Sequence, residues 1–385
     1  MKGNCFQIVY VLISGFLLLF QGHAFALGNR TNHSNSDSTE LSVLARIGEE
    51  VLDWVTWERD EFVITVYPSL SASPRNGFVY GVAPALKWNS SHPGKANTLT
   101  MNAETSTKNI LQLQFEHEWY FHPDWMTSGE AFISSREDQY WLGTDETEIY
   151  FDRREFRLKW DVLANVLPAF WIGAEWFLNN NHFDNKAEVS FSEADLEGHK
   201  GDWLFGMGPK IEVDTRHRTI SPQKGTWIQV SPSFVGLAGI GKYDYFRLTM
   251  DARRYLQLKK DKTTLAFQGI IDYAEPGVPF FEEPQLGGKE RLRGIGHPLR
   301  ETGNAVWLFR GELRQHLWWR LGGVVFAGFG ESSDNFQNPF SGTISSVGGG
   351  LRLRMLPDDP LNVRFDFGVS SSGTTGFFVS LKEAF

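Results

Sequence analysis

The chain has 385 residues and a formal net charge of −9 at pH 7. This charge argues against a nucleic-acid partner, because binding to a phosphate backbone depends on an excess of Lys and Arg. Aromatic residues make up 14% of the sequence and there are 38 Gly, a mixture of strand-forming and turn-forming residues that is typical of an all-β protein. Beyond the first 26 residues no run of about 18 apolar residues occurs, so no helical membrane span is predicted. A membrane β-barrel remains compatible with this composition, because its lipid-facing residues alternate with polar ones.

The first 26 residues have the features of a secretory signal peptide. Lys2 precedes an apolar run from Val9 to Phe20, and the Ala-x-Ala site Ala24-Phe25-Ala26 predicts cleavage after Ala26. The alternative, an N-terminal anchor helix, needs a longer apolar run of about 20 residues. The only Cys is Cys5, so the mature chain is expected to contain no thiol.

Residues 27–59 are expected to form a polar linker and a short helix ahead of a single domain over residues 60–385. Residues 27–39 are rich in Asn, Ser, Thr and Asp, which predicts disorder. Residues 40–57 carry apolar side chains mostly three or four positions apart, a spacing that predicts an amphipathic helix.

From about residue 60 onward, apolar and polar residues alternate in one run after another, separated by Gly, Asn, Asp and Pro. A period of two is typical of strands with one apolar face. The predicted strands are 61–69, 77–88, 97–104, 111–121, 127–135, 145–163, 168–180, 203–213, 226–236, 243–257, 263–273, 304–318, 321–331, 345–355, 361–369 and 374–384. Their number, about sixteen, is even and suits a closed, single-chain antiparallel barrel.

A soluble β-sandwich or propeller would also show alternation. The second face of the strands favours a membrane barrel, since Arg364 and Asp366 alternate with Phe365 and Phe367. The Arg310-to-Arg314 segment follows the same pattern. A charged lumen with an apolar, aromatic outer surface predicts this combination.

The segment from Leu286 to Ile295 combines three Gly with four charged residues between two predicted strands. Gly287, Gly288 and Gly294 permit a tight turn that approaches another part of the wall closely. Arg293 lies on this turn and, if buried, needs a carboxylate partner, because an unpaired buried charge costs several kcal/mol. Glu312 is the nearest acidic residue on a predicted strand.

This pattern of Leu-Gly-Gly, Leu-Arg-Gly and a following Glu-x-Arg resembles the bacterial surface antigen family. That family comprises the outer-membrane barrel domain of the BamA/TamA-type insertases and of two-partner secretion transporters. The resemblance implies a transmembrane antiparallel β-barrel whose loop folds into the lumen, with the loop Arg in contact with acidic residues on the inner wall. Members usually carry small periplasmic POTRA modules before the barrel, and the 33 residues from Leu27 to Arg59 are too few to hold one.

Two further segments resemble motifs of the family. Asp214 and Arg216, followed by Pro222 and Gly225, resemble its Asp-x-Arg, Pro-x-x-Gly turn. The final residues resemble an outer-membrane targeting strand, with an apolar face and a terminal aromatic that closes it; these residues are Phe377, Val379, Leu381 and Phe385. Lys382 stands where the family usually has Gly.

The chain departs from the family at Phe326-Ala327-Gly328-Phe329-Gly330, where an Asp is usual in place of Gly328. We therefore expect Glu312 to pair with Arg293 alone, or with support from Glu331. The alternative is that Glu312 pairs with Arg310 or Arg314 along the wall.

Pro84 lies inside a predicted strand. In this family the first and last strands meet at a weak seam, and a proline near it would remove a ladder hydrogen bond. An ordinary β-bulge explains Pro84 equally well.

No enzyme, cofactor or metal site is expected. The His residues, including His182, His199, His217 and His297, lack the spacing that metal binding or nucleophilic catalysis requires. The acids Glu137 and Asp138 follow Ser134 and Ser135 but have no His nearby in sequence, so they are expected to belong to a solvated loop.

The resemblance implies a bacterial outer-membrane location, reached through the periplasm after signal-peptide cleavage. It also implies a role in outer-membrane protein assembly or polypeptide transport. The expected partners are outer-membrane lipid and client polypeptides, or a separate periplasmic partner that replaces the missing modules. The alternative is a passive pore or structural barrel that has lost the transport role.

Overall fold

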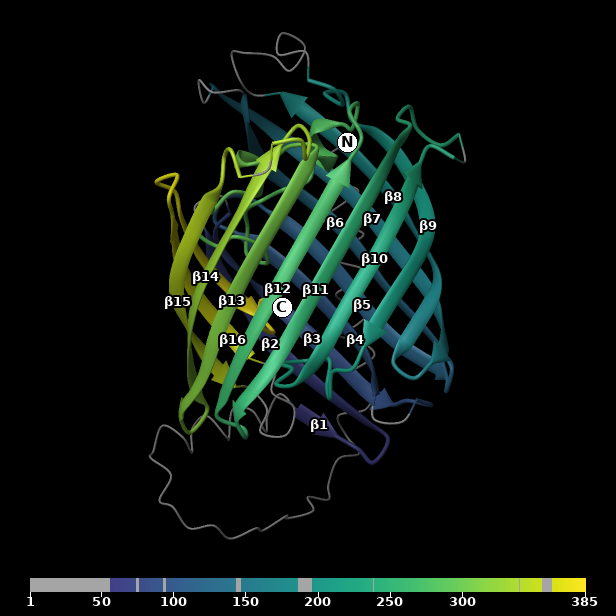
Figure 1. Ribbon diagram of the computed structural model, residues 1–385, viewed down its shortest axis with the longest axis vertical. Helices are drawn as coiled ribbons and strands as arrows, with labels where there is room; N and C mark the ends of the chain where they lie inside the picture. The colour runs from purple at the N-terminus through teal and green to yellow at the C-terminus, as the bar shows by residue number, and fades with distance from the viewer. Residues whose placement is uncertain are drawn as a thin grey trace. The chain divides into compact units, whose positions relative to one another are not determined.

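The computed structural model describes residues 56–73, 76–92, 95–142, 147–185, 196–237, 239–338, 340–354 and 362–385. Within them, seventeen antiparallel strands form one sheet (Figure 1). The strands are β1 (Thr56–Glu58), β2 (Phe62–Ser73), β3 (Gly77–Asn89), β4 (Ala96–Ser106), β5 (Leu111–His122), β6 (Trp125–Leu142), β7 (Thr147–Leu167), β8 (Phe170–Asn185), β9 (Asp202–Asp214), β10 (Gly225–Val235), β11 (Tyr245–Lys259), β12 (Thr263–Ala274), β13 (Ala305–Trp318), β14 (Leu321–Ser333), β15 (Ile344–Arg354), β16 (Asn362–Ser370) and β17 (Thr375–Leu381).

Sixteen of these strands, β2 to β17, agree with the sixteen predicted runs to within a few residues at most ends. The seventeenth, β1, has only three residues and pairs with β2. Thr56 and Trp57, the last two residues of the expected helix, belong to β1, so the helix prediction is wrong there. The rest of that helix, the linker and the signal peptide lie outside the described residues.

Each strand pairs with the next along the chain, from β1–β2 to β16–β17, so the topology is a simple meander. The strand order also places β17 beside β2. Neighbours in this order are hydrogen-bonded, so β17 and β2 are paired within the described part of the chain.

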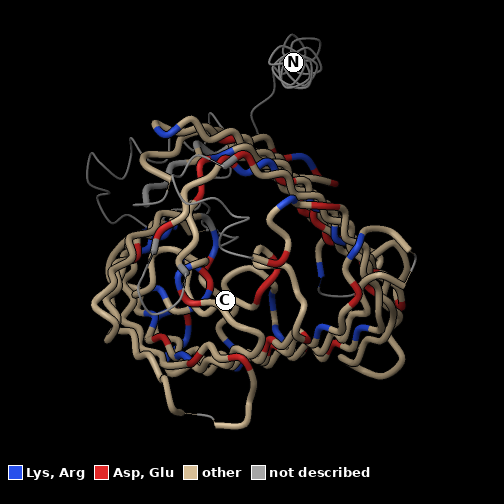
Figure 2. Tube along the Cα trace, turned by 90° about the horizontal axis from the view of Figure 1, so that it is seen from above, with Lys and Arg blue, Asp and Glu red and all other residues tan. Residues whose placement is uncertain are grey.

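The two faces of the sheet differ in polarity as the sequence predicts. On β16, Phe365 and Phe367 retain 40% and 53% of their surface, whereas Arg364 and Asp366 between and beside them are fully buried. Seen from above, acidic and basic residues follow the wall, and further chain segments lie inside the ring of strands (Figure 2). Arg364 and Asp366 contact Lys289 and Arg293 of the segment between β12 and β13, so the charged face is the inner one, and the aromatic face suits contact with lipid.

Pro84 lies in β3 opposite Val66 of β2. The β3–β4 ladder is interrupted here, since pairing stops at Val82↔Ala103 and resumes at Ala85↔Thr100 in unchanged register. An unchanged register means that no residue has been inserted, so the bulge interpretation is wrong. The missing N–H of proline accounts for a local gap in the ladder.

The longest described connection, residues 275–304 between β12 and β13, contains two short 3₁₀ helices, η1 (Phe280–Glu282) and η2 (Pro298–Arg300). We call residues 275–304 the inner loop. Among the described residues, no helix is long and apolar enough to cross a membrane.

Candidate functional site: the inner loop and its contacts with the wall

The tip of the inner loop is a compact turn closed by its own backbone. Gly287 forms an isolated β-bridge with Leu292, and Gly288 N–H donates to the Ile295 carbonyl over 3.0 Å. Gly288 has a φ of +114°, a conformation that residues with a Cβ rarely adopt. The turn thus needs Gly at this position, and it points Arg293 away from the loop.

Apolar side chains fix the turn to the inner wall. Loop residues and residues of β12 and β13 form one buried cluster, made of Leu286, Leu292, Ile295, Ile270, Val306 and Leu308. Burying these side chains removes apolar surface from water, which stabilises the docked loop.

Arg293 extends from this turn and contacts three different strands. Its guanidinium forms ion pairs with Glu312 of β13 and with Asp366 of β16, the latter over 2.7 Å. It also lies 3.5 Å from the ring centroid of Phe326 of β14, a cation–π arrangement. The Arg293 side chain is buried, so its charge is held between two carboxylates and an aromatic face.

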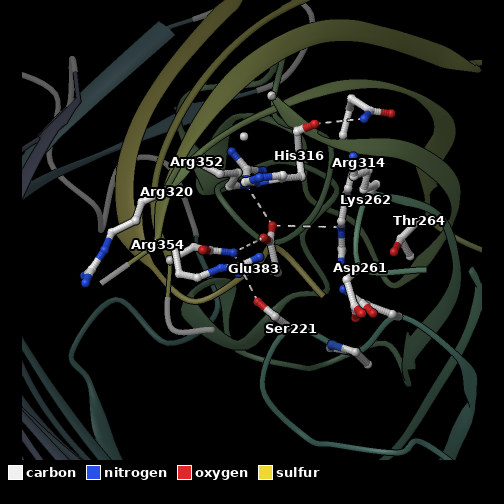
Figure 3. Close-up of a pocket in the computed structure, with 16 residues that line it drawn as sticks. Ser221, Asp261, Lys262, Thr264, Arg314, His316, Arg320, Arg352, Arg354 and Glu383 are labelled. Atoms are coloured by element: carbon white, nitrogen blue, oxygen red, sulfur yellow. Dashed lines mark hydrogen bonds and ion pairs between the residues drawn. The ribbon is translucent and has the colours of Figure 1, made fainter. Parts of the chain in front are cut away.

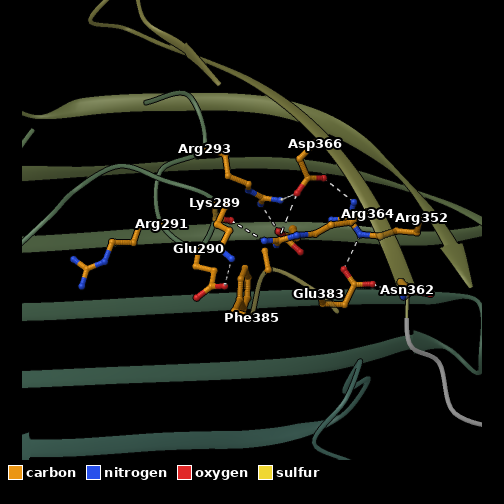
Figure 4. A network of polar contacts seen from close by, with 12 residues as sticks. Lys289, Glu290, Arg291, Arg293, Arg352, Asn362, Arg364, Asp366, Glu383 and Phe385 are labelled. Carbon is orange, nitrogen blue, oxygen red and sulfur yellow. Dashed lines mark hydrogen bonds and ion pairs between the residues drawn. The ribbon is translucent and has the colours of Figure 1, made fainter. Parts of the chain in front are cut away.

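Four more Arg side chains lie close to these acids, and two of them, Arg352 and Arg364, are labelled beside Asp366 in Figure 4. Arg314 Nε donates to Glu312 over 2.9 Å, and Arg352 Nη1 donates to Asp366 over 2.6 Å. Arg364 and Arg310 bind backbone carbonyls of the loop, at Lys289, Glu290 and Arg291. We call Arg293, Glu312, Asp366 and the Arg residues 310, 314, 352 and 364 the lock network.

The network corrects two parts of the sequence interpretation. Glu312 does not hold Arg293 alone, because Asp366 shares the charge. Glu331 gives no support, since it instead accepts hydrogen bonds from Phe340 N, Ser341 Oγ and Gly342 N in the β14–β15 connection. The proposed alternative, pairing of Glu312 along the wall, occurs together with the Arg293 pair, because each Glu312 oxygen takes one Arg.

The surroundings of Gly328 explain why β14 has no acidic residue at this position to pair with Arg293. A Cβ there would lie 3.0 Å from Leu292 Cδ2 and 2.8 Å from Arg310 Cβ, so the loop packs directly over this position. Asp366, two strands away, supplies the second carboxylate. Sequence reasoning placed Asp366 on the inner face but missed its pairing with Arg293.

Gly294 brings the loop against β15 and the β16–β17 turn. Its N–H donates to Ser346 Oγ over 2.9 Å, and its carbonyl accepts from Thr374 Oγ1 over 2.9 Å. A Cβ at this position would come within 2.5 Å of the Val369 carbonyl group, closer than atoms in proteins approach.

We therefore expect Gly294→Ala to displace the loop tip and to destabilise the docked loop by about 1–3 kcal/mol, as overpacking usually does. The measurement is the rate of proteinase K cleavage within residues 275–304 of the purified barrel. Gly277→Ala is the matched control within the same loop, because nothing lies within 4 Å of a Cβ there, although its φ of +96° adds some strain. Equal cleavage rates in both variants would contradict this account of Gly294.

The outer parts of the loop contact the wall at β6. Glu283 Oε2 accepts hydrogen bonds from Tyr140 over 3.0 Å and Thr302 over 2.6 Å. Burial raises the pKa of Glu283, and these two hydrogen bonds partly offset the effect. His297 Nε2 lies 3.2 Å from Asp138 Oδ1.

This last contact corrects the expectation for the serine pair. Ser134 and Asp138 are buried residues of β6, not part of a solvated loop, and a His does lie beside the acid. Ser134 Oγ accepts from Arg136, and Asp138 lies beside His297 of the loop. We interpret these contacts as loop anchors.

The predicted turn motif lies where β9 connects to β10. Asp214 Oδ1 accepts from Arg216 N and Nε, both over 2.9 Å, and Asp214 Oδ2 accepts from Lys95 over 2.6 Å. Pro222 is buried within the connection and Gly225 is the first residue of β10. The motif closes this connection and does not contact the lock network through any described hydrogen bond or ion pair.

The C-terminal segment departs from the expected alternating strand. Phe377 faces outward and Val379 is buried, while β17 ends at Leu381, whose side chain lies outside the described part. Lys382 has a φ of +65°, which is where the family favours Gly. Beyond it the chain turns inward, so Phe385 does not close the strand.

The Phe385 ring lies inside the barrel against two members of the lock network. Arg310 and Arg314 lie 4.5 Å and 5.1 Å from its centroid. Arg314 Nη2 also donates to the Phe385 carbonyl over 2.8 Å. The inward turn therefore joins the end of the chain to the residues that hold the loop.

The remaining interior contains a cavity of about 830 Å³. Polar and charged residues of β5, β6 and β7 line one side of it, and Lys289, Glu290 and Arg291 of the loop line another. In the described part of the chain, no cluster of three or more His, Cys, Asp or Glu is arranged to hold a metal ion. The site thus contains a charged cavity beside the docked loop.

Comparison with known proteins identifies relatives of this fold. Residues 93–377 match the Omp85 superfamily domain. No curated protein is similar enough in sequence to match. Among solved structures, BamA from Haemophilus ducreyi lacking POTRA domains 1–3 is 13% identical, with a TM-score of 0.56 over 85% of this chain and 70% of that one.

Two structures of CdiB are also similar. CdiB from Acinetobacter baumannii is 9% identical, with a TM-score of 0.54 over 91% of this chain and 69% of that one. CdiB from Escherichia coli is 13% identical, with a TM-score of 0.50 over 82% of this chain and 62% of that one. At such low identities these likenesses establish the fold alone.

Proposed function

Because this chain belongs to the Omp85 superfamily, we propose that it is an outer-membrane barrel that assembles or transports polypeptides. In the closed state of this barrel, the inner loop is docked against the wall. The proposal concerns a physical mechanism in which no bond of a substrate is broken. The lock network holds the loop, and polypeptide enters or leaves at the junction between β17 and β2.

One observation carries this proposal: the lock lies next to the junction of β17 and β2. Gly294 binds Ser346 of β15 and Thr374 of the β16–β17 turn, and Arg293 binds Asp366 of β16. The strand that follows, β17, has only seven residues. A strand edge that is released from its neighbour is a template for an added strand. Movement of the loop would thus change the contacts that β15, β16 and the β16–β17 turn make close to this edge.

A second function, a passive pore, is favoured by the cavity. A space of about 830 Å³ lined by polar side chains would conduct ions if it continued through the barrel. The two functions differ in whether the docked loop interrupts the passage.

Conductance of the protein in a planar lipid bilayer separates these functions. We expect small, flickering or absent currents from protein that is shown separately to have inserted. Arg293→Ala should then give a larger conductance, because the loop is no longer held. A large, steady, salt-dependent current from the unchanged protein would instead support the passive pore and contradict the plugged state.

Assembly activity needs its own measurement. Liposomes containing the barrel should accelerate folding of a urea-unfolded, eight-stranded outer-membrane barrel, compared with liposomes that contain a porin of similar size. Equal folding rates in the two preparations would contradict an assembly role.

The proposal includes the route and the partners of the protein. The chain would cross the periplasm after cleavage at Ala26 and then insert into outer-membrane lipid. Client polypeptides, delivered by a periplasmic partner, would meet the barrel at the end where β17 terminates. No cofactor is part of this mechanism, and the residues that carry it are Arg293, Gly294, Glu312 and Asp366.

A further inference from the structure

Residues 382–385, which follow β17, lie inside the barrel in the manner of a bound peptide, and we call them the inward segment. Lys382 Nζ donates to Glu116 Oε2 over 2.7 Å. Glu116 belongs to β5, which β2, β3 and β4 separate from β17. Glu383 accepts from Arg352 Nε of β15 over 2.7 Å. The segment is therefore held by strands on both sides of β17.

The second half of the inward segment is buried. Ala384 and Phe385 each retain 5% of their surface, and they form one cluster with Tyr255 of β11 and Ala266 of β12. Arg310 Nη2 also donates to the Ala384 carbonyl over 3.1 Å. Every peptide has carbonyl groups, so a hydrogen bond to one holds the backbone without selecting a sequence. The buried ring of Phe385, in contrast, fills a space that suits an aromatic residue.

The side chain of Glu383 is held between cations. It lies beside a small cavity of about 70 Å³ that Arg314 and Arg352 also line (Figure 3). Only 6% of this side chain is exposed, and its second carboxylate oxygen accepts from Asn362 over 2.6 Å. Charge-assisted hydrogen bonds of this kind favour an acidic residue over a neutral one. Lys382 lines the larger cavity beside the inner loop, so a cavity adjoins the segment on each of two sides.

Three Arg side chains hold the inward segment and the inner loop at the same time. Arg310 donates to two backbone carbonyls of the loop and to one of the segment. Arg314 and Arg352 each bind one of the two carboxylates that hold Arg293, and each also binds the segment. The loop and the segment are therefore two ligands of one set of cations. Two ligands that share binding groups in this way are energetically coupled.

From this arrangement we propose that the inner wall contains a peptide-binding site, that the inward segment occupies it in cis, and that its occupation stabilises the docked loop. The ligand is a short peptide with an acidic, a small and an aromatic residue in that order. When the site is empty, the three shared Arg side chains each lose an acceptor, and they hold the loop less firmly. The site does not depend on whether the barrel assembles polypeptides or conducts ions.

Loop cleavage in the 385-residue chain tests the coupling. Phe385→Ala removes the ring that lies against Arg310 and Arg314. It should raise proteinase K cleavage within residues 275–304 about tenfold, the effect of losing roughly one cation–π contact. Phe377→Ala is the matched control, since Phe377 belongs to β17 but faces outward. Equal cleavage of the two variants would overturn the proposal.

Binding in trans tests the site itself. A barrel that ends at Leu381 is mixed, in a maltoside detergent, with a fluorescent peptide of residues 380–385, and fluorescence anisotropy measures binding. We expect one peptide to bind per chain, and loop cleavage to slow as the site fills. A peptide that carries Glu383→Gln and Phe385→Ala is the control, and it should bind about a hundredfold more weakly because it lacks two contacts.

Heat-dependent migration on SDS gels verifies that each barrel has folded. The 385-residue Phe385→Ala barrel takes the place of the shortened one if that one fails to fold. Recovery of loop protection with the unchanged peptide alone supports the proposal. No binding of either peptide, equal binding of both, or binding that leaves the cleavage rate unchanged would each contradict it.

Discussion

Arg293→Ala is expected to release the inner loop from the barrel wall. The change leaves Glu312 and Asp366 without their shared partner and removes the cation over Phe326. Breaking a buried ion pair by removing one partner typically costs about 3–5 kcal/mol. Proteinase K cleavage within residues 275–304 should rise by at least about a hundredfold, because each 1.4 kcal/mol changes an equilibrium tenfold.

Arg293→Lys is the control that keeps the positive charge but not the planar geometry of the guanidinium group. A Lys ammonium keeps the charge but lacks the planar group that reaches two acids and stacks on a ring. We expect an intermediate cleavage rate. If Arg293→Ala leaves both the loop and the barrel as protected as before, the lock does not exist.

Glu312→Gln should be the second most disruptive change. It removes the negative charge that Arg293 and Arg314 both bind. The two guanidinium groups then repel each other in a buried site, at a cost of several kcal/mol. The result should again be measured as loop cleavage.

The energetic coupling between Arg293→Ala and Glu312→Gln distinguishes the loss of a specific ion pair from a general destabilisation of the barrel. Glu312→Gln should cost much less in an Arg293→Ala background, because the pair is already broken. Glu283→Gln is the matched control, since Glu283 accepts hydrogen bonds only from hydroxyl groups in its described contacts and the amide oxygen of Gln keeps one acceptor. Additive effects of Arg293→Ala and Glu312→Gln would show that the pair contributes nothing of its own.

Most of the barrel could be predicted because its signals are local. Alternation along β5 or β16 and the turn residues between strands depend only on neighbouring positions. The Gly residues of the inner loop likewise predict a tight local turn, and Gly288 has the positive φ that such a turn requires.

What could not be predicted depends on distant parts of the chain. Asp366 pairs with Arg293 across 73 positions of sequence, and only the folded sheet brings β16 beside the loop. The inward turn at Lys382 is similar, because Phe385 is held by Arg310 and Arg314 of β13. His297 beside Asp138 was missed for the same reason.

The unequal lengths of the strands have a consequence for the surrounding bilayer. β7 has 21 residues, whereas β16 and β17 have nine and seven. At about 3.3 Å per residue, β17 is roughly 23 Å long even before it is tilted, less than the roughly 30 Å thickness of a typical hydrocarbon core. Lipids beside this short strand must thin to avoid hydrophobic mismatch, as they would not beside β7. The membrane is thus thinnest along the edge between β17 and β2, where a new strand has the shortest distance to cross.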